Sequence, residues 1–468
     1  MSNPGDADAT PITSVRQLAE HIAVGCKPHD RFAIGTEHEK FGFRRSDLST
    51  PAYEPPVGQM GGIRAMLEGL AAGAPGTWKP ILDHGRPIGL SSNTYAAISL
   101  EPAGQLELSG GLTADLHEAR AELEAHYAEV RPVADRLGIG FAPLGFHPLN
   151  RREDMPWMPK GRYAIMKAYM PKVGTRGLDM MTRTCTVQVN LDYASEADMV
   201  AKLRIGLALQ PLASAMFANS PFVEGKPSGF LSYRSHVWTD TDNARSGIPG
   251  VVFEDGFGFE RYANWLVDTV PMYFAYRYGA YIDLSGRSFR DFMDGKLGSN
   301  AAGEATVGDF ADHMTTAFTD ARLKRYIEMR GADAGSAEMM IAQSAFWVGL
   351  FYDQAALAAA TALVASRPWT EFAALRPLVP RTALHTPWQK GTLRDLMRDA
   401  LAISRDGLRA RARFDSSRRD SLGRDETIHL APLEAIAAGA PTQAERWLER
   451  YHGPWRGDVT RMLHEAAI

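Results

Sequence analysis

The sequence predicts an α+β fold in which strands gather in one sheet and helices cover it. Strand-like segments with period-two alternation dominate the first 110 residues, and another lies near residue 190. They do not alternate regularly with helices, which argues against a doubly wound parallel sheet. Beyond about residue 310 the pattern becomes mostly helical, and residues 391–412 and 442–453 have the spacing of amphipathic helices.

The elements expected along the chain follow from local patterns. A helix over roughly 14–24 precedes a strand in FAIGTEHEKFGF, and a second helix is expected over GGIRAMLEGLAA. Strands follow around KPILDHG, IGLSSNT and AISLEPAGQLELSG. A long helix is predicted over 112–138, starting at Thr113 and stopping at a glycine. TCTVQVNLD alternates polar and apolar residues without a break, which makes it the clearest strand of the chain.

Length and composition indicate one large fold. Of the 468 residues we expect 1–13 to be a flexible tail and 14–468 a single domain, mixed to about 388 and helical over 389–468. The most apolar stretch, LRIGLALQPLASAMFA, is interrupted by Arg204, Gln210 and Pro211, so no membrane span is expected. Fifty-one basic against 55 acidic residues give no excess that would point to nucleic acid or an anionic membrane.

The two cysteines are too few for a disulfide framework or a thiolate zinc site. A reducing compartment therefore fits best. The polar, acidic start MSNPGDADATPITS resembles neither a signal peptide nor an Arg-rich transit peptide. From both observations we expect a cytoplasmic protein.

Carboxylates on strand faces carry the chemical signal. Glu37 and Glu39 lie two apart in GTEHEKF and so point to one face of a strand. In SLEPAGQLELSG the polar residues occupy one set of alternate positions, and the leucines occupy the other. The polar set is Ser99, Glu101, Gln105 and Glu107, and the apolar set is Leu100, Leu106 and Leu108. In TCTVQVNLD the polar parity holds Thr184, Thr186, Gln188, Asn190 and Asp192. Three such faces in one sheet would collect the oxygen ligands that magnesium or manganese prefers, although each face alone could simply be exposed to water.

Arginines and lysines that could hold anions occur in three segments. MPKGRY contains Lys160 and Arg162, and RLKRYIEMRGAD contains Arg325 and Arg330 beside Glu328. FLSYRSHVWTDTDNARSG supplies Arg234, His236 and Arg245. Arginine can bind a carboxylate or phosphate through two parallel hydrogen bonds, whereas any single arginine can equally be an ordinary surface charge. Tyr233 and Trp238 are read as packing residues, and His38, His147 and His236 as structural histidines.

Several common motifs are absent from the sequence. It contains no GxxxxGK[ST], no GxGxxG after a strand, no HExxH and no GxSxG. P-loop, dinucleotide-binding, zincin and hydrolase-elbow interpretations are therefore excluded. The residues alone predict a metal-dependent enzyme that handles phosphate.

Long ordered strings resemble plant-type glutamate-cysteine ligase, also called gamma-glutamylcysteine synthetase. They are IGTEHEKFGF, SLEPAGQLELSG, RREDMPWMPKGRY, YMPKVGTRGLDMMTRTCTVQVNLD, ALQPLASAMFANSPFVEGKPSGFLSYRSHVWTDTDNARSG, VPMYFAYR and RLKRYIEMRGAD, and the likeness runs from about residue 14 to the C-terminus. The resemblance implies a glutamine synthetase-like fold, in which a curved, mainly antiparallel sheet forms an active-site funnel surrounded by helices. It also implies ATP-dependent joining of the glutamate γ-carboxylate to the cysteine α-amine through γ-glutamyl phosphate, the first step of glutathione synthesis.

The same resemblance implies roles for individual residues. The metal cluster, with Mg²⁺ or Mn²⁺ as cofactor, would comprise Glu37, Glu39, Gln105, Glu107 and Glu328. Arg330, Arg234 and Arg245 would be catalytic, and Lys160 and Arg330 would bind ATP. The substrates, glutamate and cysteine, would contact Arg162, Gln188, Asn190, Tyr233 and Trp238. We expect a monomer or weak homodimer.

The cysteines depart from the plant pattern. Leu284 and Ser299 occupy the positions of one regulatory disulfide, and Cys26 faces Ile341 where its partner would be. Neither bridge can form, so activation by oxidation of the plant kind is not expected.

Two alternatives remain open from the sequence. One is a related carboxylate-amine ligase that uses another amine acceptor, and the other is a non-catalytic relative that keeps the fold. ADP release that depends on the acceptor would distinguish all three.

Overall fold

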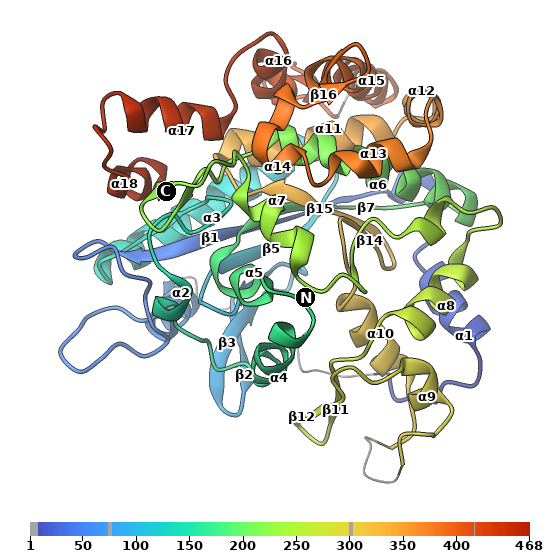
Figure 1. The fold of residues 1–468 in the computed structure, drawn as a ribbon, viewed down its shortest axis with the longest axis horizontal. Coiled ribbons are helices and arrows are strands. Elements are labelled where there is room, and N and C mark those ends of the chain that lie inside the picture. Colours follow the sequence, from blue (N-terminus) through green and yellow to red (C-terminus); the bar gives the residue numbers. More distant parts are fainter. Residues whose placement is uncertain (1–7, 74–76, 299–302, 416) are drawn as a thin grey trace.

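A computed structural model describes residues 8–73, 77–298, 303–415 and 417–468. Within these residues the main sheet has nine strands, and every neighbouring pair in it is antiparallel. The order along the sheet is β14 (Ala321–Leu323), β15 (Ile327–Asp333), β7 (Thr186–Leu191), β1 (Ile34–Arg44), β5 (Leu106–Thr113), β4 (Ala97–Leu100), β3 (Arg86–Ser91) and β2 (Lys79–Asp83), with β6 (Ile139–Ala142) on the far end of β1. In Figure 1 β2 and β3 stand steeply against β1, so the sheet bends. The α+β fold and the antiparallel sheet are confirmed.

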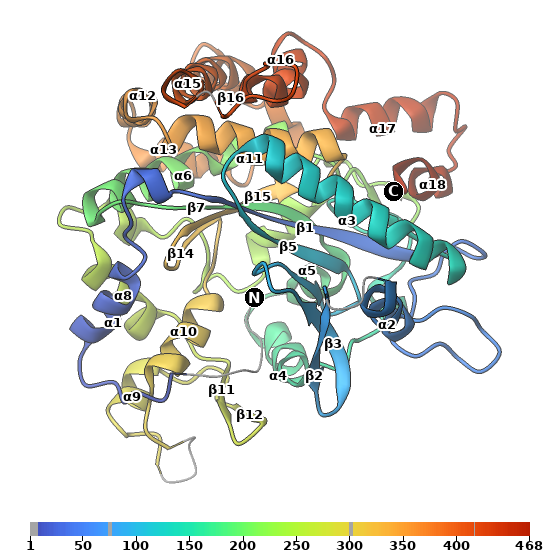
Figure 2. The same cartoon turned by 180° about the vertical axis from the view of Figure 1, so that it is seen from behind.

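Helices cover the apolar face of this sheet. They are α3 (Leu116–Arg136), α6 (Glu196–Met216) and α11 (Ala337–Phe351), and α12 (Gln354–Ala365), α15 (Leu393–Phe414) and α16 (Ala431–Ala437) form a further layer above them. Both ribbon views show α11, α15 and α16 on one side of the sheet and α4 (Gly161–Tyr169) and α10 (Val307–Thr315) on the other (Figures 1 and 2). The remaining helices are α1 (Val15–Ala23), α2 (Ile63–Gly73), α5 (Gly177–Arg183), α7 (Tyr233–Val237), α8 (Phe259–Thr269), α9 (Phe289–Met293), α13 (Trp369–Leu375), α14 (Val379–Thr382), α17 (Gln443–His452) and α18 (Thr460–Ala466).

Four short strand pairs lie outside the main sheet among the described residues. They are β8 (Phe222–Val223) with β9 (Lys226–Pro227), β10 (Ser246–Gly247) with β13 (Phe318–Thr319), β11 (Phe274–Arg277) with β12 (Ala280–Asp283), and β16 (Pro387–Trp388) with β17 (Gly391–Thr392). Of these pairs β10 and β13 run parallel. They shape loops around the main sheet rather than extend it.

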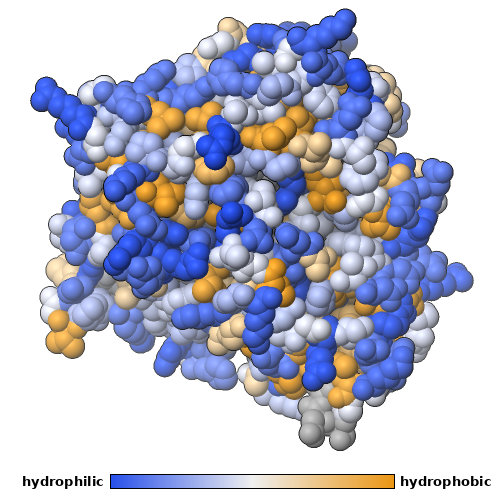
Figure 3. Space-filling model, in the orientation of Figure 1, coloured by the Kyte–Doolittle hydropathy of each residue, from blue (hydrophilic) through white to orange (hydrophobic). Residues whose placement is uncertain are grey.

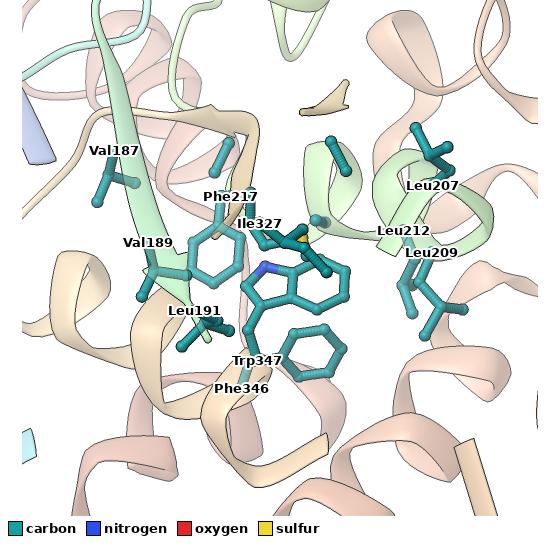
Figure 4. Packing of buried hydrophobic residues seen from close by; sticks show 14 of the residues in the cluster. Val187, Val189, Leu191, Leu207, Leu209, Leu212, Phe217, Ile327, Phe346 and Trp347 are labelled. Atoms are coloured by element: carbon teal, nitrogen blue, oxygen red, sulfur yellow. The ribbon is translucent and has the colours of Figure 1, made fainter. Parts of the chain in front are cut away.

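The core lies between β7 and the covering helices. Val187, Val189 and Leu191 of β7 and Trp347 of α11 belong to one cluster of buried hydrophobic residues (Figure 4), and all four side chains are at most 2% exposed. The period-two pattern therefore places the apolar parity of TCTVQVNLD in the core and leaves its polar parity on the opposite face. In Figure 3 the hydrophobic surface residues form separate patches between hydrophilic ones. Among the described residues no single helix could cross a membrane by length and composition, although the bent pair α11 and α12 together passes that test.

Local signals set most of the element boundaries. The side chain of Ser14 caps α1, and Thr442 with Glu445 forms a capping box at the start of α17. The helix predicted over 112–138 is α3, but its N-cap is Asp115 rather than Thr113. Asp115 accepts hydrogen bonds from two backbone N–H groups of the first turn, which a threonine two residues earlier cannot reach.

At two places the structure differs from the expected boundaries. Residues 8–13 are not a loose tail, because Ile12 N–H donates to Ala305 at 2.9 Å and Val307 N–H donates to Thr10 at 2.8 Å, which docks the segment on the start of α10. Residues 1–7 lie outside the described residues. The helical part starts at Ala337 rather than near 389, since the last strand of the main sheet, β15, ends at Asp333 and only the β16–β17 pair interrupts the helices that follow.

Candidate active site

A cavity of about 160 Å³ lies on the polar face of the sheet, open to solvent. Its walls come from β1, β5, β7 and β15 together with α4, α5, α7 and α10. The lining residues are Glu37, Glu39, Glu101, Pro102, Glu107, Arg162, Tyr163, Met166, Met180, Met181, Thr184, Thr186, Gln188, Arg234, Trp238, Phe274, Thr315, Thr316, Phe318, Arg322, Lys324, Glu328 and Arg330. Carboxylates and guanidinium groups make up much of this lining, which fits charged ligands.

Carboxylates from β1, β5 and the turn between β4 and β5 form one end of the cavity, the acidic end, made of Glu37, Glu39, Glu101 and Glu107. Glu39 lies directly opposite Glu107 across the strand pair. Burial, and then the charges of Glu107 and Glu328, raise the pKa of Glu37. Burial, with Glu101 and Glu107 next, raises the pKa of Glu39 well above its usual value. Burial and the neighbouring carboxylates therefore disfavour the ionised forms of Glu37 and Glu39.

Neutral groups donate the hydrogen bonds that these carboxylates accept. Asn190 donates to Glu37 at 2.8 Å, and the backbone N–H of Thr186 donates to Glu39 at 2.9 Å. The hydroxyl of Ser99 donates to Glu107. Such donors orient the carboxylates without neutralising them.

The β14–β15 hairpin forms the other end of the cavity, the basic end, made of Arg322, Lys324, Glu328 and Arg330. Arg322 is paired with Glu328 across the hairpin, and the ammonium of Lys324 lies 2.7 Å from Glu328. Arg330 contributes a third cation, 3.8 Å from Glu328. Burial alone would raise the pKa of Glu328, but these three cations hold it well below its usual value. Three cations around one carboxylate leave a net positive charge at this end.

Arg234 and Arg330 lie where the two ends meet. A bulge in β15 follows Met329, and there Arg330 donates to the amide oxygen of Gln188 at 2.5 Å. Burial and the charge of Arg322 lower the pKa of Arg330 to about 10, so it stays charged at neutral pH. Arg234 donates to the backbone oxygens of Arg330 and Gly331 at 2.9 and 3.2 Å. Among the described residues its Nε has no hydrogen-bond partner.

A second, smaller pocket of about 30 Å³ lies beside these arginines. The two spaces share Arg234, Trp238, Phe318 and Arg330. Asp320 and Arg376, which pair at 2.9 Å, line the smaller pocket. The site is therefore divided into a main chamber and a side chamber.

The structure brings most of the predicted site residues to the cavity. Those that line it are Glu37, Glu39, Glu107, Glu328, Arg162, Arg234, Arg330, Gln188 and Trp238. Strand alternation places Glu37, Glu39, Glu107, Gln188, Glu328 and Arg330 on one face because β5, β1, β7 and β15 are consecutive strands of one sheet. Arg162, Arg234 and Trp238 lie on helices instead. The histidines are structural as expected: His147 accepts from backbone N–H groups and His236 stacks on Phe230.

Five predicted residues do not line the cavity. Both amide atoms of Gln105 bond to backbone, through Ala103, Met181 and Thr184, so it is not a metal ligand. Arg245 is buried against Asp242 and the ring of Tyr273, which makes it a structural ion pair. The other three residues contact protein groups beside the cavity. Asn190 donates to Glu37, and Tyr233 packs on Phe146 and Phe230. Lys160 donates to the backbone oxygen of Leu100 at 2.7 Å.

Sequence reasoning missed two cations of the basic end. It named Arg325, which instead bonds outward to His21, and passed over Arg322 and Lys324. The sequence did contain a signal for them. Leu323, which is fully buried, lies between Arg322 and Lys324, and in a strand its two neighbours point to the opposite, polar face.

The donor set fits a hard divalent cation in charge and atom type, although no metal cage is preformed. Among the described residues no three His, Cys, Asp or Glu side chains are grouped to hold an ion. Glu328 is already neutralised by its three cations, which removes it from the predicted cluster. Glu37, Glu39 and Glu107 remain, with carboxylate oxygens of the kind that magnesium binds.

Both cysteines are free. Cys185 is fully buried on the core face of its strand, and burial raises the pKa of its thiol well above the usual value. Leu284 and Ile341 are buried apolar residues. Ser299 lies outside the described residues.

Comparison with known proteins gives consistent results. The model of glutamate-cysteine ligase family 2 matches residues 33–465. A chloroplastic glutamate–cysteine ligase of Arabidopsis thaliana is 47% identical over 98% of this chain and 83% of its own length. The chloroplastic glutamate–cysteine ligase B of Oryza sativa subsp. japonica is 48% identical over 97% of this chain and 87% of its own.

A solved structure resembles the fold at much lower identity. It is the glutamate–cysteine ligase of Francisella tularensis in complex with AMP, with a TM-score of 0.51 and 12% identity over 93% of this chain and 89% of that chain. At this identity the likeness concerns the fold alone.

The expected cytoplasmic location is contradicted. The relatives from Arabidopsis thaliana, Nicotiana tabacum, Brassica juncea and Medicago truncatula are chloroplastic enzymes, which points to the plastid for this group. The expectation was based on composition and on the first residues, and neither of these determines the cellular compartment of an enzyme.

Proposed function

The chain belongs to glutamate-cysteine ligase family 2, and on that premise we propose how its two-ended cavity joins glutamate to cysteine. It is an enzyme of the ligase class, acting in the first step of glutathione synthesis. The observation that carries the proposal is the separation of charge: repelling carboxylates at one end and a net positive cluster at the other.

The reaction has two steps in this proposal. An oxygen of the glutamate γ-carboxylate attacks the γ-phosphorus of ATP, which forms γ-glutamyl phosphate and releases ADP. The cysteine amine then attacks the acyl carbon, phosphate leaves, and the nitrogen gives up a proton. Both steps bring anionic oxygens together, so catalysis depends on fixed positive groups.

The arginines and the lysine of the cavity supply that charge. Arg322, Lys324 and Arg330 form a fixed cluster whose geometry is held by Glu328, so it needs little reorganisation when an anion arrives. Arg162 and Arg234 extend the positive surface toward the middle of the cavity. We assign phosphate oxygens to the basic end and substrate carboxylates to Arg234 and Arg162.

Glu37, Glu39 and Glu107 would hold Mg²⁺ in this scheme. The bound ion would shield the phosphate charges from one another. Burial, and then repulsion between carboxylates, raises the pKa values of Glu37 and Glu39, and this supports the role because a bound cation would favour the ionised forms.

One wall of the cavity suits the side chain of cysteine. Met166, Met180, Met181, Phe274 and Phe318 line it with sulfur and carbon atoms. A thiol is a weak hydrogen-bonding group and enters such a wall easily, whereas the hydroxyl of serine would lose its water at a cost of about 1–3 kcal/mol. We therefore propose cysteine as the preferred acceptor.

We propose that the enzyme acts as a monomer or weak homodimer. The main core cluster extends from Ile12 to Leu463, which supports one catalytic domain over 14–468.

A coupled assay of ADP release tests the function. With glutamate, ATP and Mg²⁺ present, cysteine should support turnover, its isostere 2-aminobutyrate should follow, and serine should be at least tenfold weaker in kcat/KM. Faster turnover with serine or another amine would identify a different acceptor. No acceptor-dependent ADP release would indicate a non-catalytic relative.

A further inference from the structure

Arg234 is anchored by a buried network that starts at Asp333, the last residue of β15. One oxygen of Asp333 accepts from the hydroxyl of Ser220 at 2.6 Å, and the other accepts from the hydroxyl of Ser232 at 2.9 Å. Asp333, Ser220 and Ser232 are at most 1% exposed. The guanidinium of Arg234 lies 3.9 Å from the same carboxylate.

Both serines hold the backbone that carries Arg234. The oxygen of Ser220 accepts the backbone N–H of Arg234 at 3.2 Å. Ser232 is the N-cap of α7 and accepts from the N–H of Ser235 at 3.1 Å. Since α7 has only five residues, it has little helical stability of its own and depends on these contacts.

The network continues into the C-terminal helices through Asn219. Its backbone N–H donates to Asp333 at 2.9 Å, and its side-chain amide donates to the backbone oxygen of Ala334 at 2.7 Å. The side-chain oxygen of Asn219 accepts from the indole N–H of Trp447 on α17 at 2.7 Å. A continuous path of hydrogen bonds thus joins α17 to the backbone of Arg234.

We propose that Asp333 and Asn219 are positioning residues for Arg234, and that Trp447 makes α17 part of the support of the substrate site. This inference rests on the proposed function, in which Arg234 binds a substrate carboxylate. The packing allows little freedom here: a Cβ on Gly145 would stand 2.4 Å from the carboxyl group of Asp333. A support held this tightly fixes the direction of an arginine at the cavity.

The first test replaces the buried carboxylate. In Asp333→Asn one acceptor becomes a donor and cannot accept both serine hydroxyls, so α7 should lose its fixed orientation. We expect the KM for glutamate to rise about tenfold, as partners of liganding groups typically show, with kcat reduced less and the KM for ATP unchanged. The matched control is Asp192→Asn, another buried aspartate, which bonds to Lys27 and Ala33 instead; it should lose thermal stability without moving the KM for glutamate.

The second test acts from a distance and keeps the proposal testable if Asp333→Asn does not fold. Trp447→Phe removes the indole donor to Asn219, and Trp455→Phe removes the neighbouring stacked indole, whose N–H bonds to Glu465. Both should lower the Tm, but only Trp447→Phe should raise the KM for glutamate, by about threefold. Equal effects of the two variants on that KM, or none from either, would overturn the role of α17.

A third variant separates this inference from the function on which it rests. Arg234→Gln should raise the KM for glutamate more than any of the other variants. If it does not, the assignment of Arg234 to substrate is wrong. If it does while Asp333→Asn and Trp447→Phe leave the KM within twofold of the wild type, the positioning network alone is wrong.

Discussion

The carboxylates of the acidic end and the carboxylate of Glu328 line the same cavity, but the protein treats them differently. Glu37 and Glu39 accept hydrogen bonds from an amide and a backbone N–H, and burial raises the pKa of both. Glu328 is surrounded by Arg322, Lys324 and Arg330, which hold its pKa well below the usual value. The acidic end lacks the neutralisation that the basic end already has.

This difference separates function from stability within one cavity. Buried like charges that face each other destabilise the fold, and they are retained where a ligand compensates them. A carboxylate enclosed by three cations instead stabilises its surroundings, because its removal leaves buried charges unpaired. Substitutions at the two ends should therefore change stability in opposite directions.

The largest effect is expected for Glu39→Gln, with Glu37→Gln in the same direction. Loss of a proposed metal ligand should lower kcat by at least a hundredfold, about 3 kcal/mol in the barrier. Relief of repulsion should at the same time raise the free energy of unfolding by about 1 kcal/mol. Activity assays and urea denaturation measure the two quantities. Near-normal turnover at saturating Mg²⁺ would remove these residues from the cluster.

The pH dependence of that stability gain has a definite sign. The pKa of Glu39 is raised in the folded state above its usual value of 4.5, so the wild-type protein loses stability as pH rises above 4.5 and through the folded pKa. Glutamine does not titrate. The advantage of Glu39→Gln should therefore grow with pH, and adding Mg²⁺ should raise the Tm of the wild type more than that of the variant.

Next in size is Glu328→Gln, which should destabilise the fold by about 3 kcal/mol. Arg322 and Lys324 would lose their buried partner and repel each other. Because the folded pKa of Glu328 is lowered, its contribution is present above the usual value of 4.5 and is lost as pH falls through the folded pKa. Urea denaturation at neutral and acidic pH checks this, and a stabilised variant would refute the contrast between the two ends.

Arg330→Lys should lower kcat/KM by about tenfold or more, although the charge is kept. Lysine cannot present the planar, two-point donor geometry of arginine, and the bond to Gln188 would be lost or bent. Arg325→Lys is the matched control, since Arg325 lies on the same hairpin but bonds outward to His21. An unchanged KM for glutamate and an unchanged kcat in Arg330→Lys would contradict the assignment.

The smallest effect, none, is expected from a strong reductant. Both cysteines are free, and neither Cys26 nor Cys185 lines the cavity. Charge at the two ends, rather than a thiol switch, should set the activity. A several-fold loss on reduction that oxidation restores would show otherwise.

The sequence was informative wherever strands alternate strictly. Glu37, Glu39, Glu107 and Gln188 were placed on the polar face because period two leaves each side chain only two directions. Resemblance to the family then supplied the function, which the family match confirms. The same rule would have found Arg322 and Lys324 had it been applied to their short strand.

Other residues could not be placed from local pattern. Arg245 and Arg234 belong to one segment of the sequence, yet Arg245 is paired with Asp242 in the core while Arg234 lines the cavity. Gln105 shares the parity of Glu107, but a turn follows β4 and lets its amide reach the backbone of Met181 and Thr184. The partners of Gln105 lie 76 and 79 residues further along the chain, so its own strand pattern could not reveal them.

The sequence by itself determined the fold class and the face on which the carboxylates lie, because these depend on spacing along the chain, and its resemblance to known proteins indicated the family. Only the tertiary structure decided which carboxylates stay uncompensated, which arginines are free to meet a ligand and which helix supports Arg234. The physical reason is that charge compensation and burial depend on distances between segments: Trp447 and Asn219 are 228 residues apart in the chain and 2.7 Å apart in the fold.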